Sequence, residues 1–420
     1  MDVTLILLGV GLILIFGYLA EFMFKKFGIP DVLFLLILGF AMGPHIFSVL
    51  HPSSVGFIAP LFTTFALLFL LFDGAFNIDL ASFAKGIASA LLFTLYNFFI
   101  SVVIVSGIMV TFGYDLLISL LFGFILGGIS SAFVIPVIQQ MKIKGETYSI
   151  LTLESALTDV FCIVSSLTVI QIIMTQAFSA KAVITTITSL FAIAGAIGII
   201  GGIVWIILVM KIFKDKRSYM MTIAFLILLF VLTEYLGGTG ALAALFFGII
   251  LRNSRQLTSI LKAILSRKKY DGSKINPIKG DLGFDATTKS EQEFYRQISF
   301  LLKTFFFVYI GILLDISDYR AVILGILLSI SIILVRNTSR FVSRGFDDFS
   351  RSLIAIMGGR GLAAAALAII AIEVAIPGAQ FLGKVVYVTI FLTILLSSVR
   401  LFLLKRSLPK EIRNTIIAEK

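Results

Sequence analysis

The sequence is poor in charge and nearly devoid of cysteine and histidine. Charged residues make up 14% of the 420 residues, against about a quarter in a typical soluble domain, whereas 59% are hydrophobic. The single cysteine, Cys162, excludes a disulfide framework and a thiolate metal site, and two histidines provide no histidine-based metal motif. Without a plausible pair of nucleophile and base, the sequence argues against an enzyme and predicts no cofactor.

Long apolar runs take the place of the missing charge. A helix needs roughly 20 apolar residues to cross a hydrocarbon core about 30 Å thick. The runs are too long and too evenly apolar for the alternating strands of a membrane barrel. We therefore expect an all-α integral membrane protein with about thirteen transmembrane helices. The expected ranges are 3–23, 31–49, 54–77, 86–112, 115–138, 148–175, 182–210, 219–236, 239–252, 297–315, 320–338, 350–373 and 382–404.

Basic residues gather on alternate connections between these ranges. One side of the membrane holds Lys25 and Lys26, Lys85, Lys142 and Lys144, Lys211 to Arg217, Arg252 to Arg296, Arg340 to Arg351, and the tail 405–420. The other side keeps only Lys181, Arg320 and Lys384. The positive-inside rule then predicts a multi-pass protein of the cell (plasma) membrane, with its N-terminus outside and its C-terminus cytoplasmic. The net charge of +11 follows from this rule and indicates membrane lipid, not nucleic acid, as a partner.

The chain reads as a single transporter domain over residues 1–420 with one long polar connection. The first apolar run lacks the basic segment and cleavage site of a signal peptide, so we expect a retained first helix. Residues 253–296 form a predicted cytoplasmic loop with an amphipathic piece near Gln256–Leu265, and 405–420 form a cytoplasmic tail. The loop could regulate the protein or simply lie on anionic headgroups.

Faint internal symmetry suggests inverted repeats. The stretch Leu38–Gly43 in the second range resembles Phe247–Ile250 in the ninth, and the fifth and twelfth ranges are both interrupted by glycine. An offset of seven helices reverses the orientation in the membrane. Inverted repeats with broken helices that meet at midmembrane are typical of secondary transporters.

Ionisable residues within the apolar ranges are the informative ones, because each costs at least a few kcal/mol at membrane depth. They are Asp73, Glu154, Asp159, Lys303, Arg336 and Arg360. Ser155 and Asp159 lie four residues apart and so share one helix face, while Glu154 and Thr158 share another. A carboxylate beside a hydroxyl suits a reversibly bound monovalent cation, Na⁺ or K⁺, and the same carboxylate can hold a proton instead. Competition between the two ions is itself an antiport mechanism, although Asp159 could also serve only as a hydrogen-bonding group between helices.

Three further groups complete the candidate site. Arg336 is the expected partner of Glu154 in a structural ion pair, which leaves Asp159 as the acid that changes its charge. Glycine clusters predict unwound helix segments whose carbonyls and hydroxyls coordinate a cation, although close helix packing would also explain them. These clusters comprise Gly127, Gly128, Ile129, Ser130 and Ser131 in one range, and Gly358, Gly359 and Arg360 in the other, where Arg360 is expected to steady the break. Asp73 and Lys303 fall near helix ends, where we expect wetted charges at the mouth of a funnel, and His45 is expected at the outer surface.

These motifs, in this order, resemble the monovalent cation/proton antiporter superfamily, and within it the NhaP-like sodium/proton exchangers. The matching stretches span nearly the whole chain: Gly28–Asp31, Leu38–Gly39, Gly43–Pro44, Leu153–Ser155 with Thr158–Asp159, Gly237–Gly240, Phe305–Gly311 and Gly358–Gly361. The resemblance implies an NhaA/NhaP-like antiporter fold, a homodimer, and core ion-transport helices within about 54–175 and 297–404 that move as an elevator. It also implies that Asp159 binds cation and proton, that Ser155 is a ligand, and that Glu154 pairs with Arg336.

Two departures from the family pattern bear on the ion. Many members have Asn-Asp or Asp-Asp where this chain has Thr158-Asp159, and Thr-Asp-Pro where it has Ser130-Ser131-Ala132. One carboxylate per site favours electroneutral exchange of one cation for one proton, with Na⁺ as the expected cation and K⁺ or Li⁺ as alternatives. Such an antiporter would serve pH homeostasis. The rival interpretations are a cation channel or efflux pathway, and a sodium-coupled symporter in which Arg360 binds an organic anion.

Overall fold

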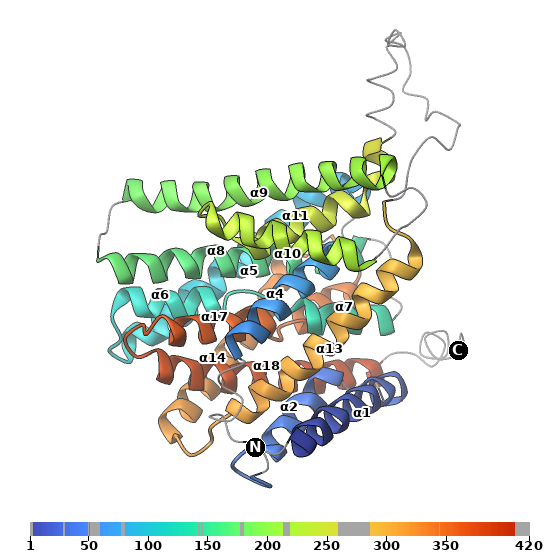
Figure 1. The fold of residues 1–420 in the computed structure, drawn as a ribbon. Helices are drawn as coiled ribbons and strands as arrows, with labels where there is room; N and C mark the ends of the chain where they lie inside the picture. Colours follow the sequence, from blue (N-terminus) through green and yellow to red (C-terminus); the bar gives the residue numbers. More distant parts are fainter. Residues whose placement is uncertain are drawn as a thin grey trace. The chain divides into compact units, whose positions relative to one another are not determined.

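A computed structural model describes residues 3–27, 30–48, 50, 59–76, 80–141, 143, 146–176, 180–212, 219–258, 286–343 and 345–407. Within these ranges every regular element is a helix, as predicted (Figure 1). Most of the predicted cytoplasmic loop and the tail beyond Ser407 lie outside the described residues, as does most of the amphipathic piece expected near Gln256–Leu265. Residues 254–258, which include its first turn, are helical.

The helices match the expected ranges in order. They are α1 (Val3–Phe27), α2 (Asp31–Met42), α4 (Ala59–Ala75), α5 (Leu80–Thr111), α6 (Leu116–Ile125), α7 (Ser131–Gln140), α8 (Glu146–Thr175), α9 (Ala180–Lys211), α10 (Tyr219–Tyr235), α11 (Gly240–Arg252), α13 (Lys289–Leu313), α14 (Tyr319–Asn337), α15 (Ser339–Val342), α16 (Asp348–Ile356), α17 (Leu362–Glu373) and α18 (Ala379–Ser407). Six of the described helices are long and apolar enough to cross a membrane, and shorter apolar helices accompany them. The prediction of a multi-span α-helical membrane protein is therefore confirmed.

The boundaries differ most from the predicted ranges at four places. The fifth range, 115–138, divides into α6 and α7, and the twelfth, 350–373, divides into α16 and α17. Glycine lies in both breaks, as the broken-helix prediction required. The second range ends early, because α2 stops at Met42 and turns follow up to Phe47. Helix α13 starts at Lys289, eight residues before the expected 297, and so shortens the predicted loop 253–296.

The chain divides into two compact units. The first comprises 1–67, 83–187 and 300–420, and the second comprises 68–82 and 188–299. The first unit therefore contains most of the stretches 54–175 and 297–404, in which the ion-transport helices were expected. Asp73, a candidate charge at a funnel mouth, belongs to the second unit.

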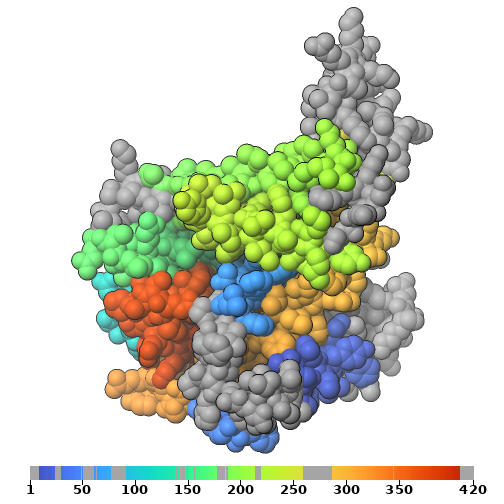
Figure 2. Space-filling model, in the orientation of Figure 1, coloured from blue at the N-terminus to red at the C-terminus, as the bar shows by residue number. Residues whose placement is uncertain are grey.

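The second unit packs around aromatic rings. Phe72 of α4 contacts Phe247 of α11 and Tyr295 of α13 at ring-centroid distances of 5.8 and 5.3 Å. Gly248 allows this packing, since a Cβ atom there would lie 2.8 Å from the carbonyl oxygen of Phe72. The green and yellow-green atoms of α9 to α11 form a continuous surface in Figure 2. Exposed side chains of these helices include Leu228, Val231 and other large apolar residues, as expected where helices face lipid.

In the first unit, α2 crosses α13 at very short range. A Cβ atom on Gly39 would lie 2.0 Å from the carbonyl oxygen of Val308, so only glycine fits there. Gly39 and Gly248, the glycines of the two related sequence stretches, thus both mark close helix crossings. Near the start of α2, Asp31 accepts a hydrogen bond from Lys303 at 2.6 Å, and the two side chains are only 4% and 12% exposed. The expectation that Lys303 is a wetted charge was wrong, because a buried carboxylate neutralises it.

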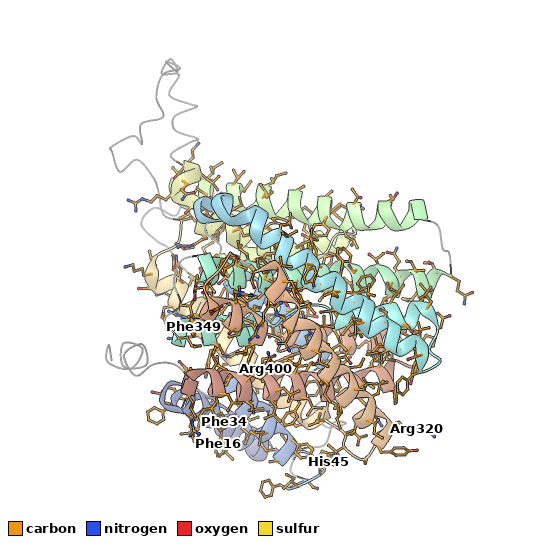
Figure 3. The ribbon with its side chains drawn as sticks, turned by 180° about the vertical axis from the view of Figure 1, so that it is seen from behind. Phe16, Phe34, His45, Arg320, Phe349 and Arg400 are labelled. Carbon is orange, nitrogen blue, oxygen red and sulfur yellow. The ribbon has the colours of Figure 1, made fainter. Side chains whose placement is uncertain are left out.

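One end of the first unit carries the residues that the charge pattern assigns to the outer surface. Figure 3 shows His45 and Arg320 at this end, with Phe349 toward the other. His45 stacks on Phe40 and lies 3.8 Å from Asp315, and the residue is exposed, as expected of a surface position.

Candidate ion-binding site

The two helix breaks meet in the first unit. Helix α6 ends at Ile125 and α7 begins at Ser131, while α16 ends at Ile356 and α17 begins at Leu362. The backbone N–H of Ser130 donates to the carbonyl of Gly359 at 2.9 Å, so the unwound segments are hydrogen-bonded to each other. The predicted broken helices are thus joined at one point, although they lie far apart in the sequence.

Glycine is required where the breaks touch their neighbours. A Cβ atom on Gly359 would lie 2.8 Å from the ring of Phe133 in α7. A Cβ atom on Gly128 would lie 2.8 Å from the sulfur of Cys162 and 3.1 Å from the carbonyl oxygen of Thr158. Close packing, the plainer explanation of these glycines, therefore holds, and it brings the first break against α8 at the level of the candidate acid.

Asp159 of α8 faces the start of α7. Its side chain is 7% exposed, and the hydroxyl of Ser131 donates to its Oδ2 at 2.7 Å. The hydroxyl of Ser130 is buried and has no hydrogen-bond partner. A carboxylate and two hydroxyls from the first break thus provide oxygen atoms of the kind that bind hard cations. The described residues contain no cluster of three or more His, Cys, Asp or Glu that could hold a metal ion, so one carboxylate characterises the site.

The remaining predicted ligands lie along α8 but are engaged differently. The hydroxyl of Ser155 donates to the carbonyl of Thr152 at 2.9 Å, so its proton is not directed at Asp159. Thr158 accepts a hydrogen bond from the backbone N–H of Ile129 at 3.2 Å and lies 3.2 Å from the carbonyl of Ser155. Thr158 therefore attaches α8 to the first break instead of offering its hydroxyl freely.

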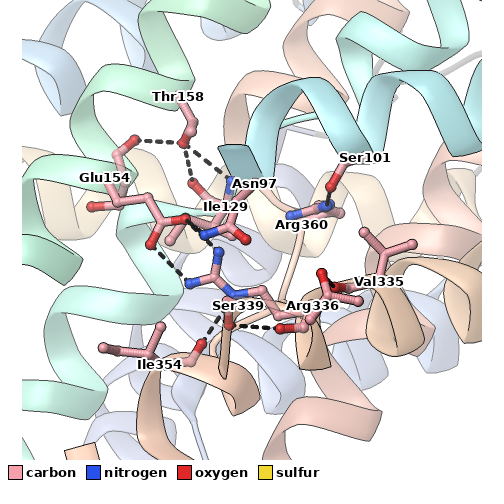
Figure 4. Close-up of polar contacts among 12 residues, drawn as sticks. Asn97, Ser101, Ile129, Glu154, Thr158, Val335, Arg336, Ser339, Ile354 and Arg360 are labelled. Carbon is pink, nitrogen blue, oxygen red and sulfur yellow. Dashed lines mark hydrogen bonds and ion pairs between the residues drawn. The ribbon is translucent and has the colours of Figure 1, made fainter. Parts of the chain in front are cut away.

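Glu154 and Arg336 form a buried ion pair, shown in Figure 4. Both terminal nitrogens of Arg336 contact the carboxylate, and Nη2 reaches Oε2 at 2.8 Å. The Nε of Arg336 donates to the carbonyl of Ile354 near the end of α16. The exposed fractions of the two residues are 0% and 3%. The pair thus joins α8 to α14 and caps the helix that precedes the second break.

Arg360 lies in the second break and is fully buried. Its Nη2 donates to the hydroxyl of Ser101 in α5 at 3.2 Å, and its backbone N–H donates to Thr393 of α18 at 3.1 Å. The Nε atom has no partner. These contacts tie the break to α5 and α18, and neither of them involves Asp159.

Sequence reasoning missed three polar residues of this region. Asn97 and Ser101 come from α5, where Asn97 donates to Glu154 at 2.8 Å, and Thr393 comes from α18. None of the three is ionisable, lies in a glycine cluster or neighbours a buried acid along one helix, the features on which the predicted site rests. An asparagine at position 97, within the apolar range 86–112, is the signal that would have found α5, because a buried amide needs a partner.

Comparisons with known proteins agree with this geometry. Residues 11–405 match the family model described as "Sodium/hydrogen exchanger, transmembrane". The structure superposes on that of the sodium proton antiporter MjNhaP1 from Methanocaldococcus jannaschii at pH 8, with a TM-score of 0.77, 22% identity and full coverage of both chains. An electron-microscopy structure of the same antiporter matches with a TM-score of 0.70 and 21% identity, over 100% of this chain and 99% of that one.

A curated relative gives a similar result at the level of sequence. The K⁺/H⁺ antiporter NhaP2 of Shewanella oneidensis is 23% identical over 396 residues, which are 90% of this chain. The match spans only 62% of the length of that relative. The family model covers nearly the whole chain, and the predicted resemblance is confirmed: the chain belongs to the transmembrane sodium/hydrogen exchanger family.

Proposed function

We propose that the chain is a secondary active antiporter that exchanges a monovalent cation for H⁺ by alternating access. The observation that carries this proposal is the buried carboxylate of Asp159, which receives a hydrogen bond from Ser131 next to two crossing helix breaks. Cation and proton compete for that carboxylate, because each neutralises the same negative charge. Ser130, Ser131 and Ser155 supply further oxygen atoms, with the backbone of Ile129 close by.

The charge balance supports electroneutral exchange. Glu154 is neutralised by Arg336, so its carboxylate takes no part in the exchange. A single carboxylate that carries either one cation or one proton returns with the same net charge in both directions. One cation therefore leaves for each proton that enters.

Na⁺ is the proposed cation, with K⁺ and Li⁺ as alternatives. The names of the related proteins point both ways, since the solved structures are of a sodium proton antiporter and the curated relative is a K⁺/H⁺ antiporter. The proposal also includes a homodimer in the cell membrane, an N-terminus outside, a cytoplasmic C-terminus and a role in pH homeostasis. The charge asymmetry of the connections supports this orientation.

Reconstituted proteoliposomes with a preset pH gradient test the proposal. Addition of Na⁺, K⁺ or Li⁺ should dissipate the gradient with the native protein and not with Asp159→Asn. The matched control is Asp348→Asn, which removes a carboxylate whose side chain is 97% exposed and should leave exchange unchanged. Cation-dependent proton movement that persists in Asp159→Asn would refute the assigned mechanism.

Two further readouts separate the rival functions. A current that depends on voltage and substrate would exclude electroneutral exchange. If none of the three cations moves protons with the native protein, the antiporter proposal fails, and the symporter and the channel become the candidates to test.

A further inference from the structure

Asn97 is the one neutral side chain that contacts the carboxylate of Glu154 among the described hydrogen bonds. It lies in the middle of α5, is 4% exposed, and its Nδ2 donates to Oε1 of Glu154 at 2.8 Å. The same oxygen also accepts from Nη1 of Arg336. A buried amide in an apolar helix is costly unless it is hydrogen-bonded, so its only described partner indicates its role.

Three donors from two helices hold Glu154. Arg336 reaches both carboxylate oxygens, and Asn97 adds the third hydrogen bond from the side of α5 (Figure 4). Hydrogen bonds to an ionised group are stronger than those between neutral groups. Arg336 alone would leave Oε1 with a single donor. Asn97 and Arg336 together form a cage of three hydrogen-bond donors that fixes the orientation of the carboxylate.

The amide orientation is set by the charge that it faces. Only the NH₂ group can donate to an ionised carboxylate, whereas the amide oxygen would repel it. In this orientation Oδ1 of Asn97 is buried and has no hydrogen-bond partner. The amide oxygen stays without a partner because the NH₂ group is directed at Glu154. The contact with Glu154 therefore determines the orientation of the Asn97 side chain.

Thr158 lies one helical turn after Glu154, but its hydroxyl does not donate a hydrogen bond to that carboxylate. Its hydroxyl accepts from the N–H of Ile129 and lies within reach of the carbonyls of Ser155 and Ile129. The donor that holds Glu154 therefore has to come from another helix. The contact joins residues 57 apart in the sequence.

We propose that Asn97 is a positioning residue for ion exchange, which locks Glu154 onto Arg336 so that Asp159 is the only carboxylate free to exchange cation and proton. The inference rests on the proposed function. The charged groups that face Glu154 are Arg336 of α14 and Arg360 in the second break, and Asp159 lies on the same helix. If Glu154 were released from its cage, a second carboxylate would compete with Asp159 for both ions.

The decisive variant is Asn97→Asp, which keeps the shape and changes the chemistry. At low pH the introduced carboxyl carries a proton and can donate to Glu154 as the amide does. At high pH it ionises, repels Glu154 and competes for Arg336. We expect exchange by the reconstituted variant to be close to that of the native protein near pH 6, and to fall by about tenfold or more near pH 8.5, the equivalent of losing one hydrogen bond to a charged group. The loss should reverse when the pH is lowered again.

Two variants control for effects on folding. Asn97→Leu removes the donor at every pH and should reduce exchange without this reversible pH dependence. Ser106→Ala is the matched control on α5, because the Ser106 hydroxyl is also buried but has no hydrogen-bond partner. Its pH profile should coincide with that of the native protein. All proteins are purified and reconstituted at low pH and checked by size-exclusion elution before the pH is raised, so that an unfolded variant is recognised.

An Asn97→Asp profile that is only a scaled copy of the native one would overturn the inference, since a purely structural residue changes activity equally at all pH values. This outcome differs from failure of the proposed function, in which the native protein itself would exchange no cation for protons.

Discussion

The buried ion pair between Asp31 and Lys303 makes a strong prediction about stability. The two residues are 272 positions apart, and their side chains meet at 2.6 Å where α2 begins beside α13. The replacement Lys303→Met removes the ammonium group while keeping most of the apolar stem. The carboxylate of Asp31, only 4% exposed, then remains without its counter-charge.

The expected loss follows from what is left around the carboxylate. Breaking a buried ion pair by removing one partner typically costs about 3–5 kcal/mol. Asp31 retains some stabilisation, because its Oδ1 accepts from the backbone N–H of Val32 at 3.0 Å and it lies at the N-terminal end of α2. The partial positive charge of a helix N-terminus contributes about 0.3–1 kcal/mol to a nearby carboxylate. We therefore expect Lys303→Met to lower the free energy of unfolding by about 2–4 kcal/mol.

A double-mutant cycle measures the pair itself. Unfolding of the purified protein by denaturing detergent is followed for the native protein, Lys303→Met, Asp31→Asn and the double variant. Asp31→Asn leaves a flexible lysine that can extend toward water, so its cost should be smaller. The double variant, which has no uncompensated charge, should be more stable than Lys303→Met alone. If the two single losses simply add in the double variant, the ion pair contributes nothing and the reasoning is refuted.

Two further predictions concern the loop after α13 and the second break. Partial burial works to raise the pKa of Asp315, but hydrogen bonds from Ser317 and Lys384 lower that pKa to about 2. The folding stability that this lowered pKa provides is present above the usual aspartate pKa of about 4 and is lost between about pH 4 and 2. We therefore expect Asp315→Asn to lower the free energy of unfolding by no more than about 1 kcal/mol at pH 7, because solvent screens the interaction, and not at all at pH 2. Thermal unfolding scans at the two pH values measure this difference. Gly359→Ala places a Cβ atom 2.8 Å from the ring of Phe133 and should destabilise the protein by about 1–3 kcal/mol and reduce ion exchange. The control is Gly358→Ala, because a Cβ atom there would approach only the flexible end of Ile333 closely, at 3.0 Å, and would meet Arg336 and Ser397 at the ordinary contact distances of 3.6 and 3.7 Å. Equal losses at both positions would contradict the packing argument.

Much of the fold was predictable from the sequence, because the bilayer imposes a simple rule. Every backbone group in the hydrocarbon core must find a partner within its own helix, so runs of apolar residues translate directly into helices. Glycine clusters predicted both broken helices for a related reason, since they weaken the helix and allow close contact. Ionisable side chains are too costly to be incidental at membrane depth, and this cost identified Asp159, Glu154 and Arg336 as candidates.

Helix boundaries and local partners were less predictable. The expectation for Lys303 was wrong because sequence position near a helix end indicates access to water but not the presence of Asp31. Hydropathy also does not record where a helix breaks, so α6 and α7 were predicted as one range. Asn97 escaped notice since an amide changes hydropathy little until its partner is known.

The sequence by itself determined that this chain crosses a membrane many times and that it belongs to an exchanger family, and it pointed to Asp159 as the candidate acid. The tertiary structure decided which side chains meet: Ser131 with Asp159, Asn97 with Glu154, and Ser130 with Gly359. The reason is physical. Hydrophobic burial and the cost of isolated charge depend on residue type and can be read along the chain, whereas a hydrogen bond depends on distance and direction between groups that only folding brings together.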